Sequence, residues 1–164
     1  MTVHSGLVKA HEHTAPLQVA LAVAFTGRGP DTRLLATRRP QGKRFAGLWE
    51  WPGGKVEAGE SPAVAACREL LEEAGIRADW HQAIAVGTHR DPGPPAIQFH
   101  VFGVPLLRPE SPAMIGCTDA RWLTPNEALA LPCPPANVEI NRLVMAWLAA
   151  ARLAPQAPRP SAAR

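Results

Sequence analysis

Short apolar runs separated by turn residues mark out the strands that this chain is expected to form. LQVALAVAF (17–25) is continuously apolar and is followed by the turn TGRGPD, a pattern that predicts a buried strand. RLLATRR (33–39) comes next and is expected to pair with it as a hairpin. Four further segments are also predicted to be strands: 48–51, 82–89, 96–107 and 119–123.

Three segments carry helix signals. In SPAVAACRELLEEAG (61–75), Ser61 suits the N-cap, Pro62 the first helical position and Gly75 the C-terminal stop. TPNEALAL opens with Thr124 as the N-cap of a short helix, and PANVEINRLVMAWLAAARL (135–153) is predicted to be the last helix. Strands around one central helix, with a helix at the end, predict an α+β fold arranged as an α/β/α sandwich.

Length and composition indicate how many domains the chain forms and which residues belong to the folded part. A chain of 164 residues with an apolar fraction of 46% fits one domain with its own core, expected at 17–153. Residues 1–16 are expected to form a flexible tail, in which His11–His13 is more simply a mobile segment than a metal site. The Pro- and Ala-rich residues 154–164 are expected to be disordered.

Charge and cysteine content narrow the class of protein. The net charge of +3 fits an anionic small molecule as well as nucleic acid. Cys67, Cys117 and Cys133 are odd in number and lack zinc spacing, so reduced thiols and a cytoplasmic location are expected. The N-terminal residues lack the apolar stretch of a secretory signal, and no run reaches the length of a membrane span, so we expect no membrane association.

The central helix concentrates three carboxylates. At about 100° per residue, Glu69, Glu72 and Glu73 share one face with Ala65 and Ala66, and the opposite face is expected to pack on the core. Like charges at this spacing destabilise a helix, which a solvated face tolerates and which a bound divalent cation would relieve. Oxygen ligands select Mg²⁺ or Mn²⁺, and Mg²⁺ is commonly held together with substrate phosphates. The pattern therefore favours chemistry on phosphate esters or anhydrides.

The loop before this helix supports the same interpretation. Gly53 and Gly54 allow a backbone to approach an ion or a phosphate closely and can present a bare carbonyl as a ligand. Arg38 and Arg39 end a predicted strand beside this loop, where a phosphate clamp would lie. Most of the basic side chains around the loop are individually typical of ordinary surface charge: Arg33, Arg38, Arg39, Lys43, Arg44 and Lys55.

The segment GKVEAGESPAVAACRELLEEAGI (54–76) resembles the Nudix box, G-x5-E-x7-R-E-U-x-E-E-x-G-U, where U is aliphatic. Every fixed position is filled: Gly54, Glu60, Arg68, Glu69, Leu70, Glu72, Glu73, Gly75 and Ile76. The resemblance implies a Nudix fold, with a mixed sheet between helices and a loop–helix–loop catalytic motif. It also implies hydrolysis of a nucleoside triphosphate to the monophosphate and pyrophosphate by a metal-activated water.

The same resemblance implies roles for individual residues. Glu69, Glu72, Glu73 and the carbonyl of Gly53 would bind the metal, and Arg68 would orient a glutamate. Arg39 would hold a substrate phosphate, with Lys55 as a further substrate-binding residue.

Two further segments, ATRRPQGKRFAGLWEWPGGK and PCPPANVEI, are similar to the MutT branch, which hydrolyses oxidised nucleoside triphosphates. The resemblance, which spans about 17–153, implies that Asn137 reads 8-oxoguanine. One amide can donate to O6 and accept from the N7–H that oxidation creates. Asn137 could instead cap the last helix, and Trp51 and Phe99 could stack on the base or belong to the core.

The chain departs from some MutT-like members, which place a carboxylate directly before the tryptophan of the late strand. Here Arg121 precedes Trp122, and Asp119 is the nearest acid. The general base therefore stays open between Glu69, Glu73 and Asp119.

Three functions follow from these patterns. The first is hydrolysis of 8-oxo-dGTP by a monomer or weak dimer with no stable nucleic-acid binding, serving nucleotide-pool sanitation, mutation avoidance and DNA repair. The second is hydrolysis of cytidine triphosphates, dihydroneopterin triphosphate or ADP-ribose. The third is a non-catalytic module that reads oxidised bases; such a module does not need the carboxylates, which this chain retains in full.

Overall fold

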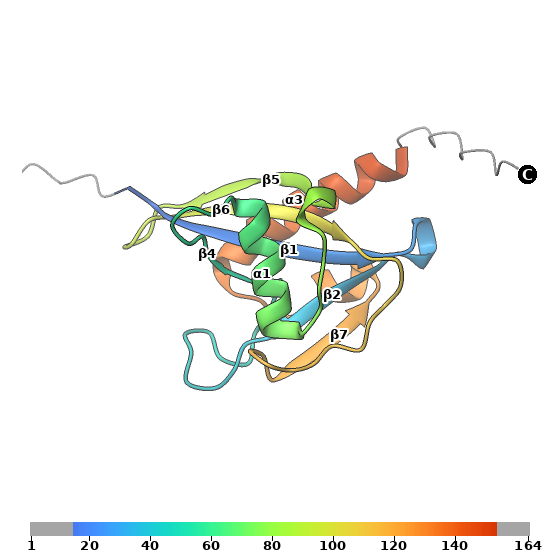
Figure 1. Cartoon of the computed structure of the whole chain (residues 1–164), viewed down its shortest axis with the longest axis horizontal. Coiled ribbons are helices and arrows are strands. Elements are labelled where there is room, and N and C mark those ends of the chain that lie inside the picture. The colour runs from blue at the N-terminus through green and yellow to red at the C-terminus, as the bar shows by residue number, and fades with distance from the viewer. Residues whose placement is uncertain (1–14, 154–164) are drawn as a thin grey trace, which may run out of the picture.

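The computed structural model describes residues 15–153, so the predicted N-terminal tail up to residue 14, with His11–His13, and the tail from residue 154 lie outside it. Figure 1 shows the arrangement of the elements. The strands are β1 (Leu17–Thr26), β2 (Arg33–Arg38), β3 (Trp49–Glu50), β4 (Gly53–Lys55), β5 (Ile84–Asp91), β6 (Ile97–Pro105) and β7 (Asp119–Leu123). The helices are α1 (Pro62–Ala74), α2 (Pro125–Leu129) and α3 (Pro135–Leu153), with 3-10 turns η1 (Gly29–Asp31) and η2 (Trp80–Gln82).

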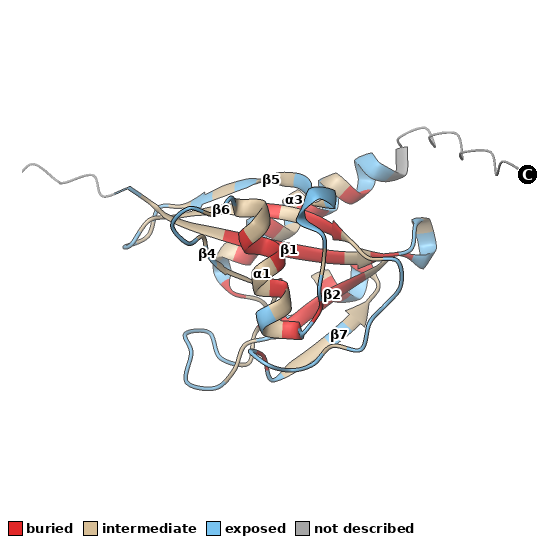
Figure 2. Ribbon diagram, viewed as in Figure 1, coloured by how far each residue is buried: buried red, intermediate tan, exposed pale blue. Residues whose placement is uncertain are grey.

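The seven strands form one mixed sheet. Its main path runs β3-β2-β1-β6-β5, while β4 pairs with β1 and β7 pairs with β2. The β1 and β6 strands are parallel, and the other pairs are antiparallel. In Figure 2, β1 is buried along most of its length, whereas β5 at the end of the path is more exposed. The predicted α+β class and the α/β/α layering are confirmed.

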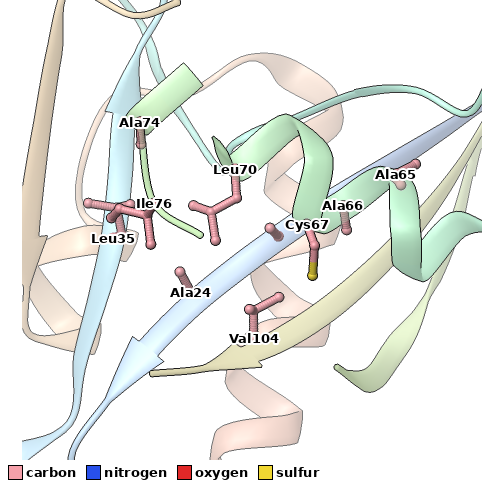
Figure 3. Close-up of a cluster of buried hydrophobic side chains, with 11 residues drawn as sticks. Ala24, Leu35, Ala65, Ala66, Cys67, Leu70, Ala74, Ile76 and Val104 are labelled. Carbon is pink, nitrogen blue, oxygen red and sulfur yellow. The ribbon is translucent and has the colours of Figure 1, made fainter. Parts of the chain in front are cut away.

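Side chains alternate along β1, so its two faces build two separate cores. One face carries Ala20, Ala22 and Ala24 and packs against α1, as Figure 3 shows for Ala24 and its neighbours. The other face carries Leu21 and Val23. It packs with Leu34 against three residues of α3, which are Ile140, Val144 and Leu148. Helices therefore cover both faces of the sheet.

The predicted ends of α1 are confirmed. The Ser61 side chain accepts a hydrogen bond from the Val64 amide at 3.3 Å, and Pro62 is the first helical residue. Gly75 adopts the left-handed conformation with φ 68°, and its amide donates to the Leu71 carbonyl. Thr124 likewise caps α2, in a capping box with Glu127.

The packed face of α1 differs from the prediction. Ala65 and Ala66, which were expected beside the carboxylates on the outer face, are fully buried, and Leu71 is only partly buried. The alanine side of β1 accepts such small side chains, so the helix is rotated with the Glu69–Glu73 edge turned toward the sheet. As a result the carboxylates do not share one solvated face.

The glycine segment also differs from the loop that was expected. Gly53–Lys55 forms the short strand β4, which pairs with Val19–Leu21 of β1. The predicted strand at 48–51 is reduced to Trp49–Glu50. Both short strands bring the glycine segment against the edge of α1, where the charged residues lie.

Candidate active site

Close packing explains the two glycines of β4. A Cβ atom at Gly53 would lie 2.4 Å from the Ala20 carbonyl oxygen, and one at Gly54 would lie 2.3 Å from Glu69 Oε1. Any larger residue at position 54 would therefore displace the Glu69 carboxylate. The glycines set the distance between the strand backbone and the acidic edge of α1.

Arg68 connects the carboxylates around the box. Its Nε and Nη2 donate to Glu60 at 3.2 and 2.8 Å, and Nη2 also donates to the Lys55 carbonyl at 2.9 Å. Its Nη1 donates to Glu69 at 2.9 Å and to Glu72 at 3.3 Å. These bonds raise the pKa of Arg68 further above neutrality, and the same guanidinium lowers the pKa of Glu60. Arg68 thus contacts two of the three helix carboxylates directly.

Glu73 has the most unusual environment of the three. Its Oε2 is buried and has no hydrogen-bond partner among residues 15–153. Burial, followed by the charges of Glu50 and Glu69, raises the pKa of Glu73 to about 8, although the Gly53 amide and Arg39 act in the opposite direction. A buried, unpaired carboxylate is costly unless a cation or a proton neutralises it.

Arg39 and Glu50 form an ion pair beside Glu73. Arg39 Nη1 donates to both Glu50 oxygens, at 2.6 and 2.7 Å, and Arg39 Nε donates to the Arg44 carbonyl at 2.8 Å. Burial raises the pKa of Glu50, while Arg39 lowers it. The guanidinium is therefore held in place by Glu50 and the backbone of the β2–β3 loop.

A recess lies on the α3 side of the sheet, next to this cluster. Its empty volume is about 210 Å³, a figure that includes open solvent at its mouth. It is lined by Ala36, Trp49, Glu50, Trp51, Ala128, Cys133, Asn137 and Asn141. Because Glu50 lines the recess and also raises the pKa of Glu73, the recess and the acidic edge of α1 adjoin.

The walls of the recess are fixed by polar contacts. Trp51 Nε1 donates to Asn141 Oδ1 at 3.0 Å, and Asn141 Nδ2 donates to Cys133 Sγ at 3.8 Å. The Trp49 amide donates to the Pro132 carbonyl at 2.8 Å, which joins β3 to the α2–α3 connection. Burial raises the pKa of the Cys133 thiol, so this residue lines the recess as a neutral group.

Comparisons with known proteins identify this arrangement. The NUDIX domain family model matches residues 16–148. The chain belongs to the NUDIX family. The CTP pyrophosphohydrolase of Escherichia coli (strain K12) is 38% identical over 125 residues, which cover 73% of this chain and 87% of that protein. The 8-oxo-dGTP diphosphatase of the same strain is 42% identical over 60 residues, covering 37% and 44%. The solution structure of the E. coli ORF135 protein superposes with a TM-score of 0.65 at 31% identity, covering 89% and 96%.

Membership of the NUDIX family confirms the resemblance drawn from the box and from the MutT-like segments. The protein is a NUDIX hydrolase that acts on nucleotide pyrophosphate bonds, a class of enzyme that generally uses divalent metals. No helix within residues 15–153 combines the length and hydropathy of a membrane span.

The structure brings part of the predicted NUDIX site together. Glu69 and Glu73 lie at the edge of α1 beside the glycine strand, whereas the Glu72 side chain is 58% exposed. Within residues 15–153, no three acidic, histidine or cysteine side chains are arranged so that they could hold a metal ion. Arg68 instead donates hydrogen bonds to the carboxylates of Glu69 and Glu72. Binding of an ion by all three carboxylates would therefore require Arg68 to release two of them.

The predicted base-reading residues separate into two groups. Asn137 is 6% exposed, lines the recess and makes no side-chain hydrogen bond to a described residue. It is the third residue of α3, which begins at Pro135, so the alternative prediction that it caps this helix is wrong. Trp51 lines the recess as well as the core. Phe99 packs against the α3-side core and stacks on His89 with ring centroids 6.2 Å apart, away from the recess lining.

Asp119 lies on the opposite face of the sheet from α1. It is paired with Arg38 in the register that pairs Leu34 with Leu123, and both leucines belong to the α3-side core. Its carboxylate accepts a hydrogen bond from Arg121 at 2.6 Å. This position is unfavourable for a base that acts beside Glu69 and Glu73.

Sequence reasoning missed several residues of the recess. Trp49, Glu50, Cys133 and Asn141 give no signal in the chain, because only the pairing of β2 with β3 and the docking of α3 bring them together. Of the basic residues, Arg33 lies at the far end of β2 and bonds the η1 turn, so it is remote from the site. Lys55 is exposed at the end of β4, and Lys43 and Arg44 are exposed in the β2–β3 loop.

Proposed function

We propose that this NUDIX hydrolase converts a nucleoside triphosphate to the monophosphate and pyrophosphate, with 8-oxo-dGTP as the first candidate substrate. The observation that carries the proposal is the adjacency of the recess and the acidic edge of α1. Glu50 lines the recess and influences Glu73, so a base in the recess would place its phosphates beside the carboxylates and Arg39. The physiological role would be sanitation of the nucleotide pool.

The donor chemistry at the edge of α1 suits a divalent cation, which all three carboxylates could bind once Arg68 releases Glu69 and Glu72. Glu69, Glu72, Glu73 and the Gly53 carbonyl offer only oxygen donors, which hard ions such as Mg²⁺ and Mn²⁺ prefer. The buried and unpaired Glu73 Oε2 supports the assignment, because a cation would compensate its charge. When bound, such an ion supplies a water of lowered pKa and neutralises phosphate charge.

Residues of the chain would position the carboxylates, bind the phosphates and accept the proton. Arg68 holds Glu60 and repositions Glu69 and Glu72, and Arg39 donates to a phosphate from its position against Glu50. Glu69 and Glu73 remain the candidates for the proton acceptor, because Asp119 lies on the other face of the sheet. Lys55 at the end of β4 would add positive charge near the departing pyrophosphate.

The side-chain amide of Asn137 matches a base that offers a hydrogen-bond acceptor next to a donor. The O6 and N7–H of 8-oxoguanine form such a pair, whereas O6 and N7 of normal guanine are both acceptors. Asn137 lines the recess as a buried amide without a side-chain partner among the described residues, as base recognition requires. Discrimination by one such amide is worth about 1–3 kcal/mol.

A second candidate substrate is a cytidine triphosphate. The relative named CTP pyrophosphohydrolase matches over 87% of its length, whereas the 8-oxo-dGTP diphosphatase matches over 44%. Cytosine also offers an acceptor next to a donor, at N3 and N4, so Asn137 suits it equally well.

A turnover panel with Mg²⁺ or Mn²⁺ tests the proposal. It should include 8-oxo-dGTP, dGTP, CTP, dCTP, dihydroneopterin triphosphate and ADP-ribose, with pyrophosphate and orthophosphate measured separately. We expect pyrophosphate as the product and the highest kcat/KM for 8-oxo-dGTP or CTP. A preference for ADP-ribose, or release of orthophosphate from triphosphates, would contradict the proposal.

A further inference from the structure

We propose that Arg121 determines base specificity: its guanidinium, which lies over the Trp49 ring and is held by Asp119 at the rim of the recess, donates a hydrogen bond to a carbonyl oxygen of the bound base. This inference rests on the proposed function, because it assigns a residue to the base that the recess would bind. It concerns a position where MutT-like patterns do not predict a cation.

The strand register places Arg121 at the rim. Arg121 is the cross-strand partner of Ala36, and directly opposed residues project from the same face of a sheet. Ala36 and Trp49 both line the recess. The Arg121 Cζ lies 5.0 Å from the centroid of the Trp49 ring, within the distance at which a guanidinium is attracted to an aromatic face. Trp49 is itself only 8% exposed.

The guanidinium is oriented but keeps donors available. Arg121 Nη2 donates to Asp119 Oδ2 at 2.6 Å, and Nε and Nη1 make no hydrogen bond to the described residues. The side chain is 58% exposed, so its remaining N–H groups can be reached by a ligand. One carboxylate and one indole ring thus hold a planar donor group in place at the mouth of the recess.

The chemistry of the rim complements that of the interior. Asn137 provides one donor and one acceptor inside the recess, whereas Arg121 provides only donors at its edge. A base held by both would present a carbonyl oxygen toward the rim, such as O2 of cytosine or a carbonyl of 8-oxoguanine. Adenine has no carbonyl oxygen and would leave the Arg121 donors without a partner.

Equilibrium binding of monophosphates tests the proposal without relying on turnover. CMP, 8-oxo-dGMP and AMP would be titrated calorimetrically, in the presence of Mg²⁺, into wild type, Arg121→Ala and Arg121→Met. Arg90→Ala is the matched control, because Arg90 is an exposed arginine on β5 at the opposite end of the sheet. We expect both Arg121 variants to weaken CMP and 8-oxo-dGMP about tenfold and AMP less than twofold.

One further variant and a kinetic measurement extend the binding test. Asp119→Asn should weaken the same two ligands by a smaller factor, because Arg121 would lose its orientation but keep its donors. In steady state, Arg121→Ala should raise KM for the preferred triphosphate about tenfold and leave kcat within about twofold.

Three results would overturn the assignment. Wild-type affinity in Arg121→Met would show that the side chain only shields Trp49. An equal loss for AMP would show that Arg121 contacts the phosphate, and absence of CMP and 8-oxo-dGMP binding to wild type would exclude both bases from the recess. The proposed function fails on a different result, the absence of triphosphate turnover by wild type, which leaves the binding comparison interpretable.

Discussion

The acidic edge of α1 and the recess on the α3 side adjoin in space, but they are built in different ways. The acidic edge comes from one continuous segment, in which helical spacing and two glycines decide the geometry. The recess combines residues of β2, β3, α2 and α3 with Trp51, which lies between β3 and β4, and Cys133, which lies between α2 and α3. The spacing of side chains in the first region is set by their neighbours in the chain and their orientation by packing on β1, whereas a side chain in the second depends on how the whole sheet and α3 dock. Substitutions should therefore affect chemistry on one side and base preference on the other.

The largest expected effect is the loss of turnover when a carboxylate of α1 is neutralised. Glu69→Gln or Glu73→Gln should lower kcat by about a hundredfold or more at saturating Mg²⁺, because metal binding and proton acceptance both need the charge. Glu139→Gln, on the exposed side of α3, is the control for loss of one carboxylate. Near wild-type turnover in both α1 variants, measured as pyrophosphate release, would contradict the assignment of the acidic edge.

The recess is tested by truncating its unpaired amide. Asn137→Ala should reduce the ratio of kcat/KM for 8-oxo-dGTP over dGTP by about tenfold and leave dGTP hydrolysis nearly unchanged. Asn126→Ala, in the exposed part of α2, is the control. If wild type shows no preference for the oxidised base, the same comparison between CTP and UTP decides whether Asn137 reads cytosine. An equal loss on every nucleotide would mean that Asn137 supports packing only.

A smaller effect is expected at the junction of the two regions. Arg39→Ala should raise KM for the triphosphate severalfold, because Arg39 lies beside Glu50 and Glu73. Arg38→Ala should change KM less, since Arg38 donates to the Gly47 carbonyl and projects toward the other face of the sheet. Greater sensitivity at Arg38 would reverse this assignment of the phosphate contact.

The smallest effect concerns stability without metal. The pKa of Glu73 rises from 4.5 to about 8 on folding, so the folded protein binds a proton more tightly than the unfolded chain does. Its contribution to the free energy of unfolding is therefore present at low pH and is lost as the pH rises from about 4.5 to 8. In EDTA at pH 8, Glu73→Gln should melt at least about 3 °C above wild type.

Two comparisons check the origin of this stability difference. At pH 5 the two melting temperatures should converge, and added Mg²⁺ should raise that of wild type more than that of Glu73→Gln. A constant difference at both pH values would point to packing rather than charge.

Local signals explain why part of the structure was predictable. Ser61, Gly75 and Thr124 act within one turn of the chain, so the ends of α1 and α2 follow from the sequence. The orientation of α1 did not follow, because an alanine is compatible with either face of a helix and only the alanine side of β1 decides which face is buried. Asn137 was identified through resemblance to other chains, whereas Trp49 and Asn141 needed the tertiary structure to be recognised.

The alanine side of β1 has a consequence for the tolerance of this protein to substitution. The side chains of Ala20, Ala22 and Ala24 make no polar contact, yet they set how closely α1 approaches the sheet. An added methyl group there costs about 1–3 kcal/mol by overpacking, and a displacement of about 1 Å at a catalytic group can cost a hundredfold in rate. In a library selected for activity, these three positions should accept fewer amino acids than Val23 on the other face of the same strand. Small apolar residues that carry no charge themselves would then show the strictest sequence requirement in the strand.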